Sequence, residues 1–477
     1  MCVSPDKDKK DASRLANPPT GFFGSLLWMG PMLLLLGTAI GSGELVAEPA
    51  AGARYGGSLL WAIIFIIVTK ALWNEAIGRV SIVTGQSFLE TCSAAGPLVT
   101  WVPWFWYAVN ILKDFFLRGG IAAIAGQICY DVFGPLPFLG ERSDPAATAS
   151  MQVVAWTLLN YGFIWGLLTL GGYRLAETVN TILSVLFTIC LVACAAVVFP
   201  GAAHDLREGL VPSLPSSSGE WLMLMTLSGI VMSGSTTVFY SVWAEERRMG
   251  LYRLTASSVR RLTRDDSEPE SPAEIEQMRG WLRVNRMNVI VTYFLGALIC
   301  LSTFILGVAV LRPAEVTLTG PTLARELSLM MTEVAGPWAR PLFYIGAYAA
   351  VISTAIGILD GGSRMYLQPL RHILPRLFER ISAKLCQRII MLLMAVGSWT
   401  VYLLMPDALK LVVWMGAVDA PLVGVLIVSY AYLATFYLPR PYRPGIAWTV
   451  MMALIGSIYF AFGTYYFSQR LFHLLVS

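Results

Sequence analysis

Charged residues are scarce in this sequence. Asp, Glu, Lys and Arg make up 13% of the 477 residues, whereas hydrophobic residues make up 56%. About a quarter of the residues in a soluble globular domain are charged, so this composition excludes that class and predicts an integral membrane protein. The net charge is only +4, and its positive part collects in a few loops, which argues against a nucleic-acid partner. Membrane lipid is the partner that the composition predicts.

The motifs of several enzyme classes are also missing. The sequence has no glycine-rich phosphate loop ending in Lys-Ser/Thr, no His-Glu-x-x-His and no Gly-x-Ser-x-Gly. Its seven cysteines show no zinc-like spacing with a histidine. The three histidines, at positions 204, 372 and 473, fall outside the interiors of the predicted helices, which argues against a histidine proton relay. We therefore predict a protein that is not an enzyme and needs no cofactor.

Long apolar runs are what the sequence has in abundance. A run of about 20 residues crosses the roughly 30 Å of bilayer hydrocarbon as a helix, and the runs here are continuous rather than alternating, which excludes a β-barrel. The sequence predicts an all-α integral membrane protein, with a cytoplasmic tail over 1–23 and one transmembrane domain over 24–477. The eleven predicted spans are 24–50, 58–78, 100–134, 151–171, 175–200, 221–243, 287–311, 337–360, 386–405, 409–437 and 445–467.

Basic residues set the predicted orientation. With the N-terminus in the cytoplasm, about 23 of the 34 lysines and arginines fall inside, about 8 outside and about 3 within helices. We expect a multi-pass protein of the inner or plasma membrane with a cytoplasmic N-terminus; the polar N-terminus lacks the layout of a signal peptide.

The basic loop over 246–286 also contains an acidic, proline-broken segment. Its plain interpretation is a solvated loop that fixes topology, and a regulatory or partner site is the alternative.

Two spans are interrupted by small polar residues. In the first, Gly41, Ser42, Gly43 and Glu44 break the apolar run, although each interior glycine costs about 1 kcal/mol relative to alanine and an ionised Glu44 at membrane depth costs roughly 2.5–3.5 kcal/mol. In the sixth, residues 228–237 contain a similar Ser/Gly/Thr-rich stretch. Backbone can unwind at membrane depth only where it is buried in protein or lines a cavity. We interpret both stretches as breaks that form a binding site.

The spacing of the breaks predicts an inverted repeat. Five spans separate the two starts, so a first repeat over 24–200 and a second over 221–437 would run in opposite senses, with 445–467 as an extra helix. Interrupted helices at matching positions of two halves point to the midplane site of a transporter. Tight packing between helices is the alternative explanation for the glycines and serines. The predicted substrate-binding residues are Gly41, Ser42, Gly43, Glu44, Ser233, Ser235 and Thr236.

Other ionisable residues within spans are candidates for a coupling route or an ion pathway, because such residues are costly in lipid. They are Glu48, Asp114, Arg118, Asp360 and Asp419. Glu48 would lie one turn beyond Glu44. Asp114 and Arg118 stand at i,i+4 spacing, which predicts either an internal ion pair or part of a coupling route. Lys70 and Glu75 in the second span are expected to pair or to extend toward the cytoplasm.

Several motifs resemble the NRAMP-type family of divalent metal-ion transporters in the same order along the chain. They are Gly30-Pro31, residues 51–61 (AGARYGGSLLW), residues 78–85 (GRVSIVTG), residues 172–177 (GYRLAE) and residues 353–357 (STAIG). The resemblance implies the LeuT-like architecture of two inverted five-helix repeats plus one further helix, and transport by alternating access.

The departures from that family lie at the expected site. The family's Asp-Pro-Gly-Asn motif aligns with Gly41 to Glu44, and its Met-Pro-His motif aligns with Ser233 to Ser235. Glu44, nearby hydroxyls and freed carbonyls form an all-oxygen ligand set, which suits Mg, Mn or Ca. Relatives altered at these positions include magnesium transporters. The resemblance thus implies a carrier of a hard divalent cation with Glu44 as metal ligand, coupled to protons through such acids or uncoupled.

Two other functions remain open. Residues 40–43 also resemble the glycine-rich first helix of amino-acid and polyamine transporters of the same fold, where freed N–H groups bind a substrate carboxylate. Glu44 beside that position would then hold an amine. The second alternative is a receptor or scaffold that transports nothing and signals through the 246–286 loop.

Overall fold

The computed structural model describes residues 17–476 except 42, 141–142, 171–172, 248, 251–271, 317, 374–375 and 377–379. Within these residues the chain is built from helices, with no strand. The predicted acidic segment of the 246–286 loop lies outside the described residues. The helices before the first long loop are α2 (Gly21–Leu26), α3 (Gly30–Ile40), η1 (Gly43–Ala47), α4 (Glu48–Tyr55), η2 (Gly56–Leu59), α5 (Leu60–Thr84) and α6 (Phe88–Ala94).

The next elements are α7 (Val102–Phe133), α8 (Pro145–Leu170), α9 (Tyr173–Glu208), α10 (Ser218–Ile230), η3 (Val231–Val238) and α11 (Phe239–Glu246). The second half contains α13 (Pro272–Leu306), η5 (Gly307–Leu311), η6 (Gly320–Thr322), α14 (Leu323–Ala335), α15 (Ala339–Ile373), α17 (Ala383–Leu404), α18 (Ala408–Tyr432), η7 (Leu433–Tyr437), η8 (Arg440–Tyr442) and α19 (Ile446–Val476).

Each predicted span corresponds to helix. Among the described residues, nine stretches are long and apolar enough to cross a membrane. One of them, Gly30–Thr84, covers most of the first predicted span and all of the second. α7 is not among the nine, and it carries the charged residues Lys113, Asp114 and Arg118. α13 begins at Pro272, well before the predicted start at 287, so the end of the predicted basic loop is helical.

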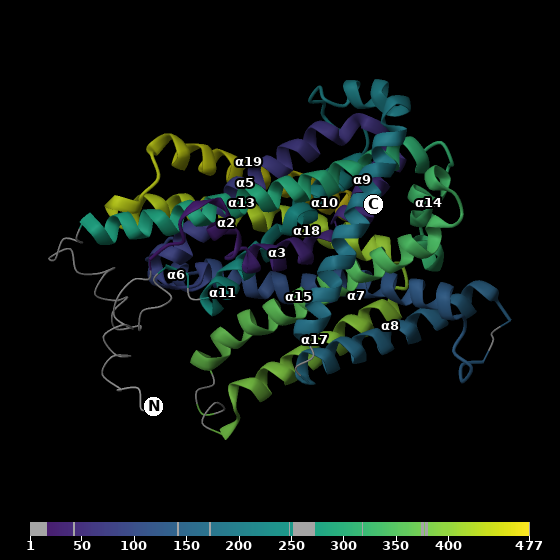
Figure 1. The fold of residues 1–477 in the computed structure, drawn as a ribbon, viewed down its shortest axis with the longest axis horizontal. Coiled ribbons are helices and arrows are strands. Elements are labelled where there is room, and N and C mark those ends of the chain that lie inside the picture. Colours follow the sequence, from purple (N-terminus) through teal and green to yellow (C-terminus); the bar gives the residue numbers. More distant parts are fainter. Residues whose placement is uncertain are drawn as a thin grey trace.

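Most of the long helices lie roughly along the long axis of a single bundle, and α9 crosses them steeply (Figure 1). α14 lies at one end of this bundle, and α2, α6 and α11 lie at the other (Figure 1). α18 packs against α7, α10 and α19, while α15 packs against α3, α7, α9 and α17. α3 and α10, the first halves of the two interrupted spans, therefore lie inside the bundle, where unwound backbone avoids lipid.

The two breaks have different geometries. In the sixth span, Met232, Ser233 and Gly234 all have positive φ, at 53°, 80° and 45°. Two of these are not glycine, and such backbone costs about 1–3 kcal/mol per residue, which marks functional sites more often than ordinary turns. In the first span α3 ends at Ile40 and a π-helical turn over Gly43–Ala47 follows, a form that is frequent at functional sites.

Glycines let the first break approach its neighbours. A Cβ at Gly43 would lie 3.1 Å from the Val231 Cα, and a Cβ at Gly41 would lie 2.6 Å from the Thr354 hydroxyl oxygen. The backbone at the first break can thus pass directly against the second. This contact brings Glu44 to the broken backbone of the sixth span.

Candidate functional site

Glu44, in the break of the first span, binds the backbone of the break in the sixth span. Its side chain is fully buried on the π turn, and its Oε1 accepts a hydrogen bond of 2.9 Å from the Met232 N–H. That N–H is free because the α10 helix ends at Ile230. Oε2 has no hydrogen-bond partner within the described residues. One oxygen of this carboxylate therefore binds the broken backbone, and the other has no hydrogen-bond partner among the described residues.

Glu48 lies at the start of α4 and is also fully buried. Its Oε2 accepts a 2.9 Å hydrogen bond from the Thr303 hydroxyl, and its Oε1 has no partner in the described chain. The Cys300 thiol of α13 lies 3.9 Å from Glu44 Oε1 and also interacts with Glu48. We call Glu44 and Glu48 the acidic pair, with Cys300 as its third neighbour.

Lys70 occupies the carbonyl side of the same break. Its ammonium donates to the Gly229 carbonyl at 2.9 Å and to the Val231 carbonyl at 2.6 Å, and the residue is fully buried. These carbonyls lie at the C-terminal end of α10, where a helix attracts a cation. The expectation that Lys70 would extend toward the cytoplasm is wrong, because the freed carbonyls supply it with acceptors inside the protein. Glu75 instead pairs with Arg79 at 2.6 Å.

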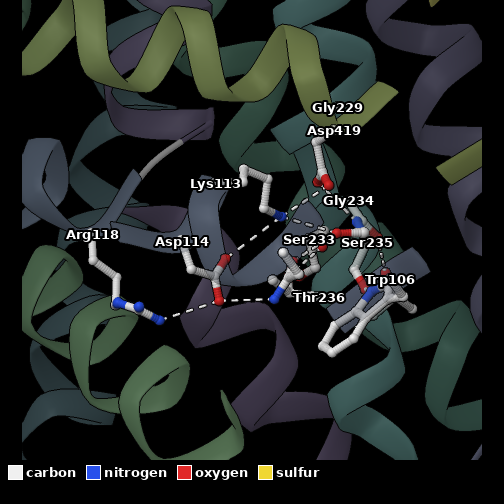
Figure 2. A network of polar contacts seen from close by, with 12 residues as sticks. Trp106, Lys113, Asp114, Arg118, Gly229, Ser233, Gly234, Ser235, Thr236 and Asp419 are labelled. Carbon is white, nitrogen blue, oxygen red and sulfur yellow. Dashed lines mark hydrogen bonds and ion pairs between the residues drawn. The ribbon is translucent and has the colours of Figure 1, made fainter. Parts of the chain in front are cut away.

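A second network of charged residues contacts the break of the sixth span at Ser235 (Figure 2). The Lys113 ammonium lies 2.9 Å from Asp419 Oδ1 and donates to the Ser235 hydroxyl at 2.9 Å. Asp419 Oδ2 accepts a 2.9 Å hydrogen bond from the Ser235 N–H. Asp419, predicted as a candidate for a coupling route or an ion pathway, joins α18 to α7 and to the unwound segment. Its role in the structure is to fix the second break.

The ion pair that the i,i+4 spacing of Asp114 and Arg118 allows is present, at 3.2 Å. Asp114 also accepts hydrogen bonds from Asn110 and Tyr366, and Arg118 donates to Ser398 of α17. Figure 2 shows this pair beside Lys113, which lies 3.7 Å from Asp114. The network therefore extends from α18 through α7 to α17.

Asp360 belongs to a separate contact. It pairs with Arg364 one turn along α15, at 2.9 Å, and accepts a hydrogen bond from the Trp243 indole. Asp360 therefore links α15 to α11 and makes no hydrogen bond or ion pair with Glu44 or Glu48 within the described chain.

The hydroxyls predicted to surround Glu44 bond elsewhere. The Ser233 hydroxyl donates to the Leu35 carbonyl, and the Thr236 hydroxyl donates to the Ser233 carbonyl. Gly41 donates its N–H to Thr354, and Ser42 lies outside the described residues. Hydroxyl groups commonly satisfy nearby free backbone acceptors in this way. Within the described chain no three His, Cys, Asp or Glu side chains are arranged to hold a metal ion in this conformation.

The sequence missed several residues of the site. Cys300 gave no signal, because a cysteine in an apolar run is usually a small hydrophobic residue. Thr303, one turn along the same helix, gave none either. Lys70 and Lys113 were visible as charges within spans, and their cost in lipid signalled a buried partner without identifying it.

Acidic groups outnumber basic groups at the two breaks. The ionisable side chains of the site, each no more than 2% exposed, are Glu44, Glu48, Asp114, Asp419, Lys70, Lys113 and Arg118. Lys70 is close enough to interact electrostatically with Glu44. Glu44 Oε2, Glu48 Oε1 and Asp114 Oδ1 have no hydrogen-bond partner among the described residues.

A bundle of membrane-crossing helices with a buried polar site between two broken helices defines a LeuT-like fold, the class that the sequence predicted. Solved structures agree. The manganese transporter of Eremococcus coleocola superposes with a TM-score of 0.63 over 94% of this chain and 88% of that one, at 13% identity. MhsT in complex with L-phenylalanine gives a TM-score of 0.54 over 92% of this chain and 98% of that one, at 14% identity. These similarities concern the fold.

A family model described as natural resistance-associated macrophage protein-like matches residues 32–467, and the chain belongs to this family. The divalent metal cation transporter MntH of Acidiphilium cryptum is 23% identical over 353 residues, which cover 73% of this chain and 71% of that protein. An uncharacterized protein of Pasteurella multocida is 23% identical over 366 residues, covering 74% and 73%. The predicted family resemblance is confirmed.

Proposed function

We propose that this chain is a secondary transporter that carries a metal cation across the membrane by alternating access. The ion binds at the acidic pair, beside the breaks of the first and sixth spans, and protons compete for the same carboxylates as the coupling ion. The distribution of lysine and arginine supports a cytoplasmic N-terminus. Membership of the family, and relatives named as divalent metal cation transporters, support a metal ion as cargo.

The acidic pair is the observation that carries this proposal. Both carboxylates are fully buried, and each keeps one oxygen without a partner in the described part of the chain. Buried polar atoms are nearly always hydrogen-bonded in proteins, and an ionised carboxylate in the membrane costs roughly 2.5–3.5 kcal/mol. Two such groups one turn apart also repel each other. A cation between them removes both costs.

Ligand chemistry supports an ion of the manganese type. Two carboxylates suit Mg or Mn, and the neighbouring Cys300 thiol adds a softer ligand that Mg does not prefer. The acidic pair and Cys300 do not converge as a metal site in the present conformation. The proposal therefore includes a small rearrangement on binding, in which the two partnerless oxygens turn toward one ion.

Uptake into proteoliposomes tests the proposal. We expect the purified protein to take up Mn²⁺, and Glu44→Gln and Glu48→Gln each to reduce uptake at least about tenfold, since each removes one charged ligand. Glu333→Gln, on the exposed face of α14, is the matched control and should transport normally. Equal uptake in the two site variants and the control would exclude the acidic pair as the binding site. No uptake of any cation would favour the receptor alternative.

The second candidate cargo is an organic amine. The observation that favours it is Glu44, whose buried Oε2 has no partner among the described residues and could accept hydrogen bonds from a bound amine. The structural neighbour MhsT, solved with L-phenylalanine, has the same fold. Thermal stabilisation of the protein by an amine or amino acid, without stabilisation by Mn²⁺, would favour this candidate.

A further inference from the structure

A basic cavity lies far from the two breaks, where α5, the start of α13 and η8 meet. Its volume is about 300 Å³, and its lining includes Arg79 of α5 and Arg443 beyond η8. The other basic residues that line it are Arg279, Arg283 and Arg286, on successive turns of α13. Five guanidinium groups thus face one space.

Acidic residues compensate this charge only in part. Glu276 lines the cavity and pairs with Arg283 at 2.5 Å. Glu75 lies behind the wall, 2.6 Å from Arg79 and 3.8 Å from Arg286. Arg279 and Arg443 form no ion pair with any described residue. Two carboxylates therefore face five guanidinium groups, and the cavity keeps a positive charge.

Arg79 lines the cavity on the α5 side and is held in place by its neighbours. Its side chain is only 10% exposed, and its two terminal nitrogens bond Glu75 and the Tyr442 carbonyl. Its Nε is buried and has no hydrogen-bond partner among the described residues. A guanidinium presents its donors in a fixed fork that matches the oxygens of a phosphate. Arg279 and Arg443 line the cavity without a carboxylate partner in the described chain, so their guanidinium groups are the donors that such a ligand would engage.

The position of the cavity indicates where this phosphate comes from. The three arginines of α13 precede its apolar part, which is the predicted span 287–311. They therefore lie at the level where a helix enters the membrane. Gln277 of the same turns contacts Asn17, so the cavity is at the end of the bundle that carries the N-terminal segment. Basic pockets between membrane helices at this level bind lipid headgroups.

We infer that this cavity is a binding site for the phosphate of an anionic lipid headgroup, and that the bound lipid ties α13 to α5. The inference is independent of the transported substrate. A phosphomonoester headgroup suits it best, because it offers three oxygens to several guanidinium groups at once.

Titration of the purified full-length chain in detergent tests this site with three separate probes: dioctanoyl phosphatidic acid, dioctanoyl phosphatidylcholine and inorganic phosphate. We expect phosphatidic acid to bind at least about tenfold more tightly than the other two probes and to raise the thermal unfolding midpoint. Each arginine near the membrane contributes about a fivefold change in affinity. The double variant Arg279→Gln/Arg443→Gln should therefore bind phosphatidic acid about 25-fold more weakly.

Arg340→Gln is the matched control, because Arg340 is an exposed arginine at the start of α15 and does not line the cavity. It should leave the affinity unchanged. An unchanged affinity in the double variant would overturn the site. Equal binding of inorganic phosphate would overturn the lipid as its source. If the double variant does not fold, the single variant Arg279→Gln, at an exposed position, should still show the fivefold loss.

Discussion

The Lys113–Asp419 contact gives the sharpest prediction about stability. The two groups are 2.9 Å apart, with side chains 0% and 2% exposed. Removing one partner of a buried pair leaves an uncompensated charge and costs about 3–5 kcal/mol. The structure indicates that the two partners are not equivalent, because they have different second contacts.

Lys113→Met should be the more damaging change. Among the described residues it leaves Asp419 with the Ser235 N–H as its one hydrogen-bond donor, so we expect a cost of about 3–5 kcal/mol. Asp419→Asn leaves Lys113 within 3.7 Å of Asp114 and keeps an oxygen that can accept from Ser235. Its expected cost is about 1.5–3 kcal/mol, the worth of a hydrogen bond to a charged group. The double variant should be more stable than Lys113→Met alone, since neither charge is then unpaired.

Reversible unfolding in mixed detergent micelles, followed by tryptophan fluorescence, measures these free energies. Lys410→Met is the control, because the Lys410 side chain is 66% exposed and pairs with Asp407 at 3.0 Å. A pair so exposed should contribute less than about 1 kcal/mol. If the two single changes cost the same and their effects add in the double variant, the buried pair does not act as described.

Three further changes test the two breaks. Lys70→Met should raise the affinity for Mn²⁺ at least about tenfold, because it removes a positive charge near the site, even though two buried carbonyls lose their donor. Calorimetric titration measures this affinity, and unchanged or weaker binding would refute the reasoning. Cys300→Ser should lower the ratio of Mn²⁺ to Mg²⁺ uptake by removing the soft ligand, and an unaltered ratio would refute that role. Gly234→Ala should abolish the folded state in a thermal unfolding assay, since φ is +45° and the new Cβ would lie 2.0 Å from the Gly229 carbonyl oxygen. Gly162→Ala, at an open position, should be tolerated.

Much of the fold could be predicted from the sequence, because the cost of placing each residue in lipid is local. Continuous apolar runs marked the spans, and the family motifs supplied their arrangement. Composition also drew attention to both breaks, since glycines and a carboxylate are costly within a span. The boundary at Pro272 was missed, because the first turns of α13 are polar and extend beyond the membrane.

The partners of the site residues were decided by the tertiary structure. Glu44 bonds a backbone N–H 188 residues away, Lys70 bonds a carbonyl 159 residues away, and Lys113 pairs with an acid 306 residues away. These contacts depend on how the helices rotate and pack against one another. The pattern of residues within a single span does not show which residues of another span it will meet. The sequence by itself determined that costly groups lie at two breaks. Only the packing of the helices decided that lysines bind the second break and that Glu44 and Glu48 keep free oxygens.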